Sequence, residues 1–411
     1  MANHYRQSLE TILYHARQLE PEIVPFHDSP GRTLAEALIA EYDDPPAPKS
    51  AMDGFAVRGT DTRSAGPGSP LTLPVRGTLG AGRTAQATWE PGAAVRIMTG
   101  ALLPQGADAV VKLEDVHRSD HGSVTLASAV EAGANVFACG ARLRSGDVVL
   151  DAGARVTPQV HGLLAGLGRS EVQVVRRPRV AVLAVGDELV EVDRAPAPGQ
   201  IHVSNLYTVS GLVERYGGVA VPLGVVGDDP DAIVERLRGG LDGGSGARGC
   251  DVVITLGGSR RGDFDFAYDA FAGVGAQIHF RDTRLNPGCS TVFASAGQAL
   301  LFGLPGTPVP SWAAFHVLVR PALERLCGAG ASHPMLRARS AEPLSVRHDW
   351  THFLPAWLAF DDEGTAQVTA LGERARGRVP GRMLANALIC LPEGTSAVGA
   401  GEPVAVQWLV R

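Results

Sequence analysis

Several short segments of this chain combine acids and glycines in ways that suit reactive or ligand-binding sites. Segment 50–58, SAMDGFAVR, places one acid, Asp53, in a polar turn that contains a glycine. The turn lies between proline-rich coil at 43–50 and an apolar stretch that favours a strand. We therefore expect the turn to present the Asp53 carboxylate at a surface, although such a turn alone identifies no chemistry.

Two loops that follow predicted strands carry acids or paired glycines. Gly186-Asp187-Glu188 comes directly after the apolar run Arg179–Val185, and Asp187 suits either a ligand site or the N-cap of a helix. Gly257-Gly258 opens a longer loop that continues to Asp265. Paired glycines let backbone N–H groups turn toward an anion, and a following helix N-terminus favours negative charge. A plain tight turn is the alternative interpretation of that loop.

A third loop, 303–308, reads GLPGTP and leads into an apolar segment with helical spacing. Its two prolines fix the backbone, and its second glycine permits close approach of a ligand. A purely structural turn explains this segment equally well. Because ligands gather beyond the carboxyl ends of parallel strands, these three loops are candidates for one shared site.

The elements that would position these loops alternate between strands and helices. Apolar spacing predicts strands at 179–185, 220–225, 251–256 and 299–303, and helices at 204–216, 231–238, 265–271 and 309–327. This alternation favours a parallel sheet covered on both faces. Residues 4–20 have helical spacing, and 33–41 suits either a helix or an extended segment. Short strands between glycine and proline turns predict a β-rich domain over 51–150, and strands at 387–391 and 403–409 predict a small terminal β-barrel.

Composition excludes several classes of protein. The 411 residues exceed one ordinary core, and 45% hydrophobic with 19% charged residues is typical of a globular chain of two to four domains. A net charge of −6 gives no indication of nucleic-acid binding, and no apolar run reaches the length of a membrane span. The start resembles no signal peptide, and the five cysteines are scattered without a CxxC pair. These features predict a cytoplasmic protein without a zinc site.

Taken together, the segments resemble one family over nearly the whole chain. SAMDGFAV, and RIMTGALLPQGADAVVKLED at 96–115, resemble the first two blocks of the MoeA/gephyrin E-domain family, the molybdopterin molybdenumtransferases. Further matches follow in family order: VGDEL, GQIHVSN, GDDP, LGG, NPG, GLPGTPV, ANALICLPEG and AGEPVAV.

The resemblance implies a multidomain α/β plus β architecture with four domains. These are a MogA-like parallel-sheet α/β domain (1–26 and 173–331), an elongated linker domain (27–45 and 147–172), a β-rich insertion domain (46–146) and a C-terminal β-barrel (332–411). It also implies a homodimer with the active cleft at the subunit interface. A MogA-like protein or a molybdoenzyme is implied as a partner, without nucleic acid or membrane.

The resemblance also implies the site residues and their ligands. The substrates would be adenylylated molybdopterin and molybdate, with Mg²⁺ as cofactor. The catalytic positions by motif are Asp53, Thr99, Glu188, Asp228 and Asp265, of which Asp228 and Asp265 would hold Mg²⁺. The positions for pterin phosphate or AMP by motif are Gly257, Gly258, Gly262, Pro305, Gly306 and Thr307. We add Arg260 and Arg261, which depart from the family's GGVSxG motif and would supply positive charge in the same loop.

The chain departs from the family pattern at several charged positions. Arg142 stands where the family has an acid, and Asp282, Asn286 and Cys289 stand where it has lysines. The QGSH motif is replaced by an arginine run at Arg374, Arg376, Arg378 and Arg382, and Val203-Ser204-Asn205 alters a D-x-N motif. Lys49 and Lys112 are the only lysines among 37 basic residues, and the other 35 are arginines. In a chain with this bias, neutral drift would replace a lost lysine by arginine, so the other residues at these positions need a different explanation.

Two interpretations of these departures remain open. In the first, arginines such as Arg260 and Arg261 have taken over anion binding, because arginine is a good bidentate ligand for phosphate. In the second, the chain binds the pterin or delivers the cofactor without catalysis. Arg142 beside a Mg²⁺ site would repel the ion by several kcal/mol. We therefore expect a molybdopterin molybdenumtransferase-like enzyme with impaired or altered activity, and a non-catalytic molybdopterin-binding protein is the alternative.

Overall fold

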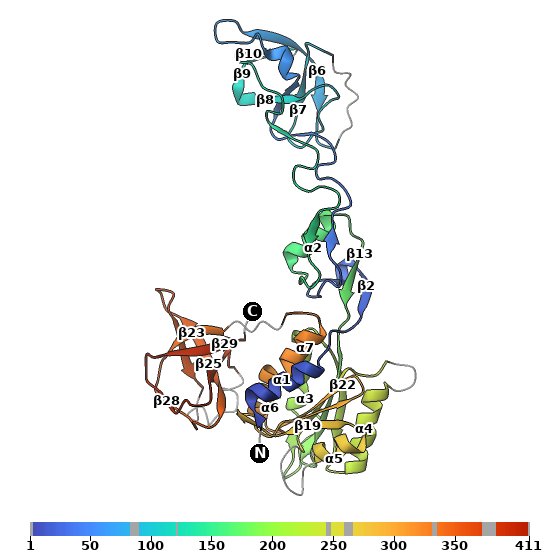
Figure 1. Cartoon of the computed structure of the whole chain (residues 1–411), viewed down its shortest axis with the longest axis vertical. Coiled ribbons are helices and arrows are strands. Elements are labelled where there is room, and N and C mark those ends of the chain that lie inside the picture. Colours follow the sequence, from blue (N-terminus) through green and yellow to red (C-terminus); the bar gives the residue numbers. More distant parts are fainter. Residues whose placement is uncertain are drawn as a thin grey trace. The chain divides into compact units, whose positions relative to one another are not determined.

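The computed structural model describes residues 3–82, 90–120, 122–243, 248–258, 266–330, 335–371 and 384–409. The chain forms two compact units, each built from separate stretches of sequence (Figure 1). Unit 1 contains 1–36, 153–161 and 170–411, and unit 2 contains 37–152 and 162–169. Among the described helices, none is long and apolar enough to cross a membrane.

A six-stranded sheet in the order β17-β14-β18-β22-β21-β19 forms the centre of unit 1. Its strands are β14 (Arg179–Val185), β17 (Val219–Val226), β18 (Val252–Leu256), β19 (Gln277–Arg281), β21 (Val292–Ala296) and β22 (Ala299–Leu304). The first four strands in that order are parallel, as predicted. β21 pairs antiparallel with both β22 and the edge strand β19, which the sequence did not indicate. The two-residue turn Gly297-Gln298 folds β22 back along β21.

Alternate residues of the central strands enter two separate cores. In β14, Val180, Val182 and Ala184 pack with one cluster, whereas Ala181, Leu183 and Val185 pack with the other. The first cluster includes α1 (Tyr5–His15), α3 (Asn205–Arg215), α6 (Pro308–Ala314) and α7 (Arg320–Leu326). The second includes α4 (Pro230–Asp242) and α5 (Phe266–Gly273). Helices therefore cover both faces, which confirms the layered prediction.

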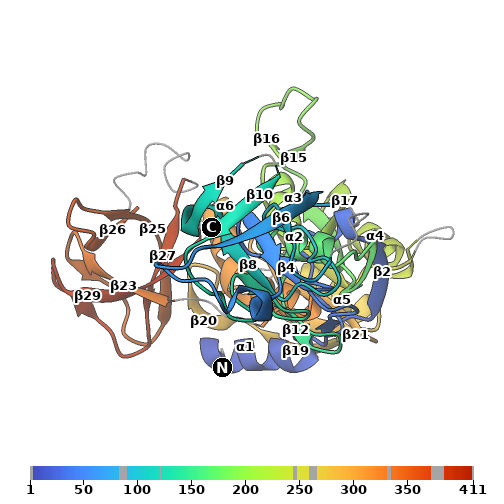
Figure 2. The same ribbon diagram turned by 90° about the horizontal axis from the view of Figure 1, so that it is seen from above.

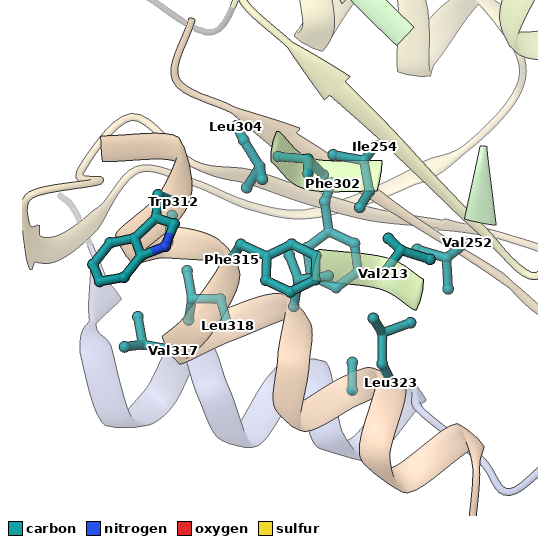
Figure 3. Packing of buried hydrophobic residues seen from close by; sticks show 14 of the residues in the cluster. Val213, Val252, Ile254, Phe302, Leu304, Trp312, Phe315, Val317, Leu318 and Leu323 are labelled. Carbon is teal, nitrogen blue, oxygen red and sulfur yellow. The ribbon is translucent and has the colours of Figure 1, made fainter. Parts of the chain in front are cut away.

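The predicted long helix at 309–327 is continuous but irregular. α6 runs into a π-helical turn, Phe315–Val319, which runs into α7. Figure 3 shows Phe315, Leu318 and Leu323 of this segment beside Phe302 and Leu304 of β22 and Ile254 of β18. Every residue from Ser311 to Leu323 is buried. This helix thereby anchors the loop at 303–308, which directly precedes it.

The C-terminal part of unit 1 is a closed β-barrel (Figure 2). The barrel strands are β23 (Met335–Ser340), β25 (Thr351–Phe360), β26 (Ala366–Ala370), β27 (Ala387–Leu391) and β29 (Pro403–Trp408). The ring closes because β25 pairs with both β26 and β27. The minor pair β24 (Leu344–Ser345) and β28 (Ala397–Val398) flanks it. The predicted barrel is confirmed.

The barrel sheet extends to the start of the chain. β20 (Thr283–Asn286) pairs with β25, and β1 (Asn3–His4) pairs with β20. Ser8 donates its hydroxyl to Thr283 Oγ1 at 2.9 Å, and Ile12 of α1 is fully buried in the first core. The N-terminal helix is therefore built into the α/β body.

Unit 2 is rich in β-structure, as its turns and short apolar runs predicted. Its sheet has the order β8-β5-β7-β6-β10-β9, from β5 (Gly54–Val57), β6 (Leu71–Leu79), β7 (Ala94–Ile97), β8 (Ala109–Lys112), β9 (Val116–Ser119) and β10 (Ser123–Leu126). The short strand β4 (Lys49–Ser50) pairs with β11 (Val136–Phe137), and β3 (Leu38–Ile39) pairs with β12 (Val148–Leu150). Because β3 lies within 33–41, that segment is extended and not helical. In unit 1, β2 (Pro21–Pro25) pairs with β13 (Glu171–Val175), and α2 (Pro158–Gly166) contains residues of both units.

Candidate functional site

A cleft of about 790 Å³ lies at the carboxyl ends of β14, β18 and β22 in unit 1. Its walls include all three loops that the sequence singled out, together with the segment 286–290 after β20. Seven of the residues predicted for the site line it: Glu188, Asp228, Gly257, Gly258, Pro305, Gly306 and Thr307. Parallel strands bring these loops together because their carboxyl ends meet at one edge of the sheet.

The floor of the cleft is bare backbone at Gly257 and Gly306. Gly257 has φ +103°, and a Cβ added there would lie 2.4 Å from the Val185 carbonyl oxygen. A Cβ on Gly306 would lie 3.2 Å from the Gly257 Cα. The backbone N–H of Gly257 donates to the Leu304 carbonyl at 3.1 Å, so it is not the free anion donor that the glycine pair suggested. Gly257 instead lets two loops approach closely.

Two other groups of these loops remain available to a ligand. Within the described residues, the Gly258 N–H has no hydrogen-bond partner, whereas its carbonyl accepts from the Ala267 N–H at 2.9 Å. Thr307 occupies the N-cap position of α6, yet its hydroxyl makes no capping hydrogen bond. Both groups line the cleft and can donate to phosphate oxygens.

The acidic side of the cleft differs from one sequence-based expectation. No helix follows Asp187, because the chain continues into the short strand β15 (Leu189–Val190). The N-cap interpretation is therefore wrong, and the Asp187 carboxylate instead accepts from the Asp228 backbone N–H at 3.0 Å. Burial raises the pKa of Asp228, and the charges of Asp187 and Glu188 raise it further. The loop thus concentrates carboxylates at one end of the cleft.

Asn205 contributes a buried amide that sequence reasoning noted only as a departure from a motif. The residue opens α3 and is 7% exposed. Its Nδ2 donates to the Gly306 carbonyl, whereas its Oδ1 is buried without a partner in the described residues. Since an unpaired buried acceptor is costly, this oxygen suits a ligand donor in the cleft. The polar pair Ser204-Asn205 at a predicted helix start was the available signal.

The segment 286–290 is held by the barrel. Asn286 Nδ2 donates to His352 Nδ1 at 3.0 Å, and His352 Nε2 donates to the Arg347 carbonyl at 3.0 Å. His352 lies in β25 and is 2% exposed, and burial lowers its pKa. The position where the family pattern has a lysine therefore carries a neutral amide tied to a buried histidine.

The described lining of the cleft contains acids but no lysine or arginine. Glu188, Asp228 and Asp282 carry its carboxylates, and His202 is its titratable base. Four predicted residues, Arg260, Arg261, Gly262 and Asp265, lie outside the described residues, as does the arginine run 374–382. The part of the cleft that the structure describes is thus negatively charged.

Asp53 and Thr99, also predicted for the site, form a local pair in unit 2. The Asp53 carboxylate accepts from both the backbone N–H and the hydroxyl of Thr99, at 2.7 and 2.8 Å. The backbone hydrogen bond from Thr99, followed by the hydroxyl one, lowers the pKa of Asp53. The side chain is therefore an exposed, firmly ionised carboxylate, as the turn predicted. Arg142, in the same unit, lies 3.5 Å from Asp44.

Comparison with known proteins places these observations in a family. Three family models match in order: the MoeA N-terminal region (domain I and II) at 3–168, a probable molybdopterin binding domain at 181–325, and the MoeA C-terminal region (domain IV) at 337–409. The chain belongs to the MoeA family. Molybdopterin molybdenumtransferases of Staphylococcus epidermidis and Bacillus subtilis are each 33% identical to it. They align with 98% and 97% of the chain and with 94% and 92% of their own lengths.

Solved structures support the same MoeA assignment. The molybdopterin biosynthesis MoeA protein from Pyrococcus horikosii superposes with a TM-score of 0.87 at 27% identity, covering the whole of both chains. A molybdenum cofactor biosynthesis protein from Pyrococcus furiosus matches 99% of the chain with a TM-score of 0.59 at 21% identity, which supports the fold alone. The expected fold class, a MogA-like parallel-sheet domain with β-rich regions and a C-terminal β-barrel, is therefore confirmed, and the division into four domains stays a prediction.

Proposed function

We propose that this chain transfers molybdenum to molybdopterin, using adenylylated molybdopterin and molybdate as substrates. The observation that carries the proposal is the cleft, where the family-motif residues of three separate loops line one volume of about 790 Å³. Such a volume is typical of a small-molecule site. Relatives with the name molybdopterin molybdenumtransferase align over nearly the full chain.

The residues of the cleft divide into donors and acceptors for such a substrate. We assign the Gly258 N–H and the Thr307 hydroxyl to phosphate oxygens, because both are donors without a partner among the described residues. Asn205 Oδ1 would accept from a hydroxyl or ring N–H of the ligand. Asn286, held by His352, would contribute a neutral amide rather than a cation.

The donor set fits Mg²⁺ in part. Glu188 and Asp228 line the same cleft, and Mg²⁺ is usually bound by one or two carboxylates together with substrate phosphates and water. Among the described residues no group of three potential metal ligands occurs, so the substrate would complete the shell. Asp228, and Asp265 by motif, would hold the ion, which would neutralise phosphate charge when bound.

A second function, binding or delivery of molybdopterin without turnover, is favoured by one observation. The described lining of the cleft has no lysine or arginine, although both substrates are anions. Positive charge must then come from Mg²⁺, from Arg260 and Arg261, or from the barrel arginines. We propose that this lack of charge slows molybdate insertion more than it weakens pterin binding. We also propose that the chain is a cytoplasmic homodimer, which sedimentation at micromolar concentration tests.

Turnover separates the two functions. Purified protein is incubated with adenylylated molybdopterin, Mg²⁺ and molybdate, and AMP release and molybdenum insertion are measured. Release of AMP with insertion of molybdenum supports the transferase. Saturable pterin binding without AMP release supports the delivery protein, and absence of both rejects the cleft as a molybdopterin site. Complementation of a MoeA-deficient strain, measured by molybdoenzyme activity, extends the test to the cell.

A further inference from the structure

A second pocket in unit 1 is lined by arginines and shares no lining residue with the cleft. Four arginines contribute to it: Arg32, Arg155, Arg176 and Arg177. The end of α7 and the turn after α3 supply Glu324, Cys327 and Tyr216. Its free volume is about 30 Å³, two to three times the roughly 10–15 Å³ that one buried water needs. The arginine pocket is therefore suited to a small ligand and not to a pterin or nucleotide.

Two of these arginines are buried and fixed in place. Arg176 is 7% exposed and contacts both carboxylate oxygens of Asp251, at 2.5 and 2.6 Å. Arg32 is 9% exposed, pairs with Glu22 and donates to the Val175 carbonyl at 3.0 Å. The Nε of Arg32 is buried and has no partner in the described residues. An unpaired buried donor on a guanidinium favours an acceptor at this position.

The other two arginines are exposed and lack counter-charges. Neither Arg155 nor Arg177 has an ion pair within the described part of the chain. Glu324, the acid in the lining, pairs with Arg320 at 2.8 Å, and Asp251 pairs with Arg176. The arginine pocket therefore carries at least two guanidinium charges without compensation.

The Cys327 thiol indicates that these charges converge. Burial raises the pKa of Cys327 to about 11, whereas Arg32, Arg155 and Arg177 act to lower it and Glu324 acts to raise it. Electrostatic effects of this kind require nearby charges. Cys327 is partly buried and lines the same pocket as these three arginines.

We propose that the arginine pocket binds a small tetrahedral oxyanion of the class of phosphate, sulfate or molybdate. Arg155 and Arg177 supply the compensating charge, and Arg32 Nε supplies a buried donor. Arginine suits such an anion because its planar fork of N–H groups matches two adjacent oxygens. The segments 31–33 and 155 lie close in sequence to two of the four crossings between the units, those at 36–37 and 152–153. A bound oxyanion would tie these segments to 175–177 in the body of unit 1.

Calorimetric titration of the full-length protein tests binding. Sodium phosphate, sulfate and molybdate are titrated separately at constant ionic strength in chloride, which identifies the preferred oxyanion. Arg155→Ala with Arg177→Ala is expected to weaken binding by about tenfold or more, since each charged hydrogen bond contributes strongly. Arg63→Ala with Arg118→Ala removes two exposed arginines of unit 2 and serves as the control of equal charge. Unchanged affinity in the Arg155 and Arg177 variant overturns the proposal.

Alkylation of cysteines locates the bound anion. Peptide mass spectrometry follows the rate at Cys327, at Cys289 in the cleft and at Cys139 in unit 2. Negative charge in the arginine pocket lowers the thiolate fraction of Cys327, so its alkylation should slow by about twofold or more. Cys139 should react at an unchanged rate. If saturating anion slows Cys289 and leaves Cys327 unaffected, the anion binds in the cleft and the arginine pocket is rejected, whatever the turnover assay shows.

Discussion

Replacing Gly257 by alanine tests the close approach that forms the floor of the cleft. The new Cβ would lie 2.4 Å from the Val185 carbonyl oxygen, closer than real Cβ contacts, and both partners are backbone held by the central strands. Gly275, also in unit 1, has φ +74° and an added Cβ there would meet no atom within 4 Å. Gly275→Ala is therefore a matched control that carries backbone strain without the contact.

The two variants should differ by the contact alone. An L-residue in the left-handed region costs about 1–2 kcal/mol, offset by about 0.4–1 kcal/mol from a less flexible unfolded chain. Gly275→Ala should therefore destabilise unit 1 by about 1 kcal/mol. Overpacking adds about 1–3 kcal/mol, so Gly257→Ala should cost about 2–4 kcal/mol.

Urea unfolding followed by tryptophan fluorescence measures both variants. Trp312, Trp350, Trp357 and Trp408 belong to unit 1 and only Trp89 belongs to unit 2, so the signal reports mainly on unit 1. A difference of less than about 0.5 kcal/mol between the variants would refute the close approach, because the contact term would then be missing. If both variants bind pyrophosphate in the cleft with equal affinity, Gly257 has no role in shaping the floor.

Four further predictions concern charge. Asp251→Ala removes the bidentate partner of the buried Arg176, which keeps Glu20 at 3.0 Å, and should cost about 1.5–3 kcal/mol in urea unfolding, whereas an exposed Asp28→Ala control should cost little. Burial lowers the pKa of His352 in the folded protein, so as the pH falls the unfolded chain binds a proton at this histidine before the folded chain does. The free energy of unfolding should therefore decrease as the pH drops below about 6.5. His352→Gln should flatten this slope, and an unchanged slope would assign it to another group such as His279. A variant that combines Arg142→Asp, Asp282→Lys and Asn286→Lys should insert molybdate faster than the wild type. Catalysis is not impaired if this variant is no faster, or if the wild type is already as fast as a relative with the full motif set. Arg260→Ala with Arg261→Ala should weaken a phosphate-bearing ligand by about 1.5–3 kcal/mol per charged hydrogen bond lost, and unchanged calorimetric affinity would contradict a role for these arginines.

The strands and the site loops were predictable because their signals are local. β14 has the bounds expected from its apolar run, since a central parallel strand is buried on both faces and needs apolar residues throughout. The loops at Gly186, Gly257 and Gly303 met at one cleft because the order of parallel strands fixes where their carboxyl ends lie.

What the sequence did not indicate depends on partners far away in the chain. Asp187 has the composition of an N-cap, but its carboxylate binds the backbone of Asp228, 41 residues later. The Gly257 N–H is used by Leu304 of the neighbouring strand, and the direction of Asn286 is set by His352 of the barrel. Such long-range hydrogen bonds leave no periodic signal, so sequence reasoning found the loops but not how their donors are used.

The incorporation of the N-terminal helix into the body of unit 1 has a consequence for synthesis on the ribosome. β1 pairs with β20 near residue 283, and Ile12 belongs to a hydrophobic cluster that extends to Leu409. Roughly 270 residues must emerge before β20 can receive β1, which at about 5–20 residues per second takes on the order of 15–55 seconds. Most of unit 2 is one continuous stretch, 37–152, that is complete long before then. The nascent chain should therefore carry a folded unit 2 while the apolar face of α1 remains unpacked until the later strands emerge.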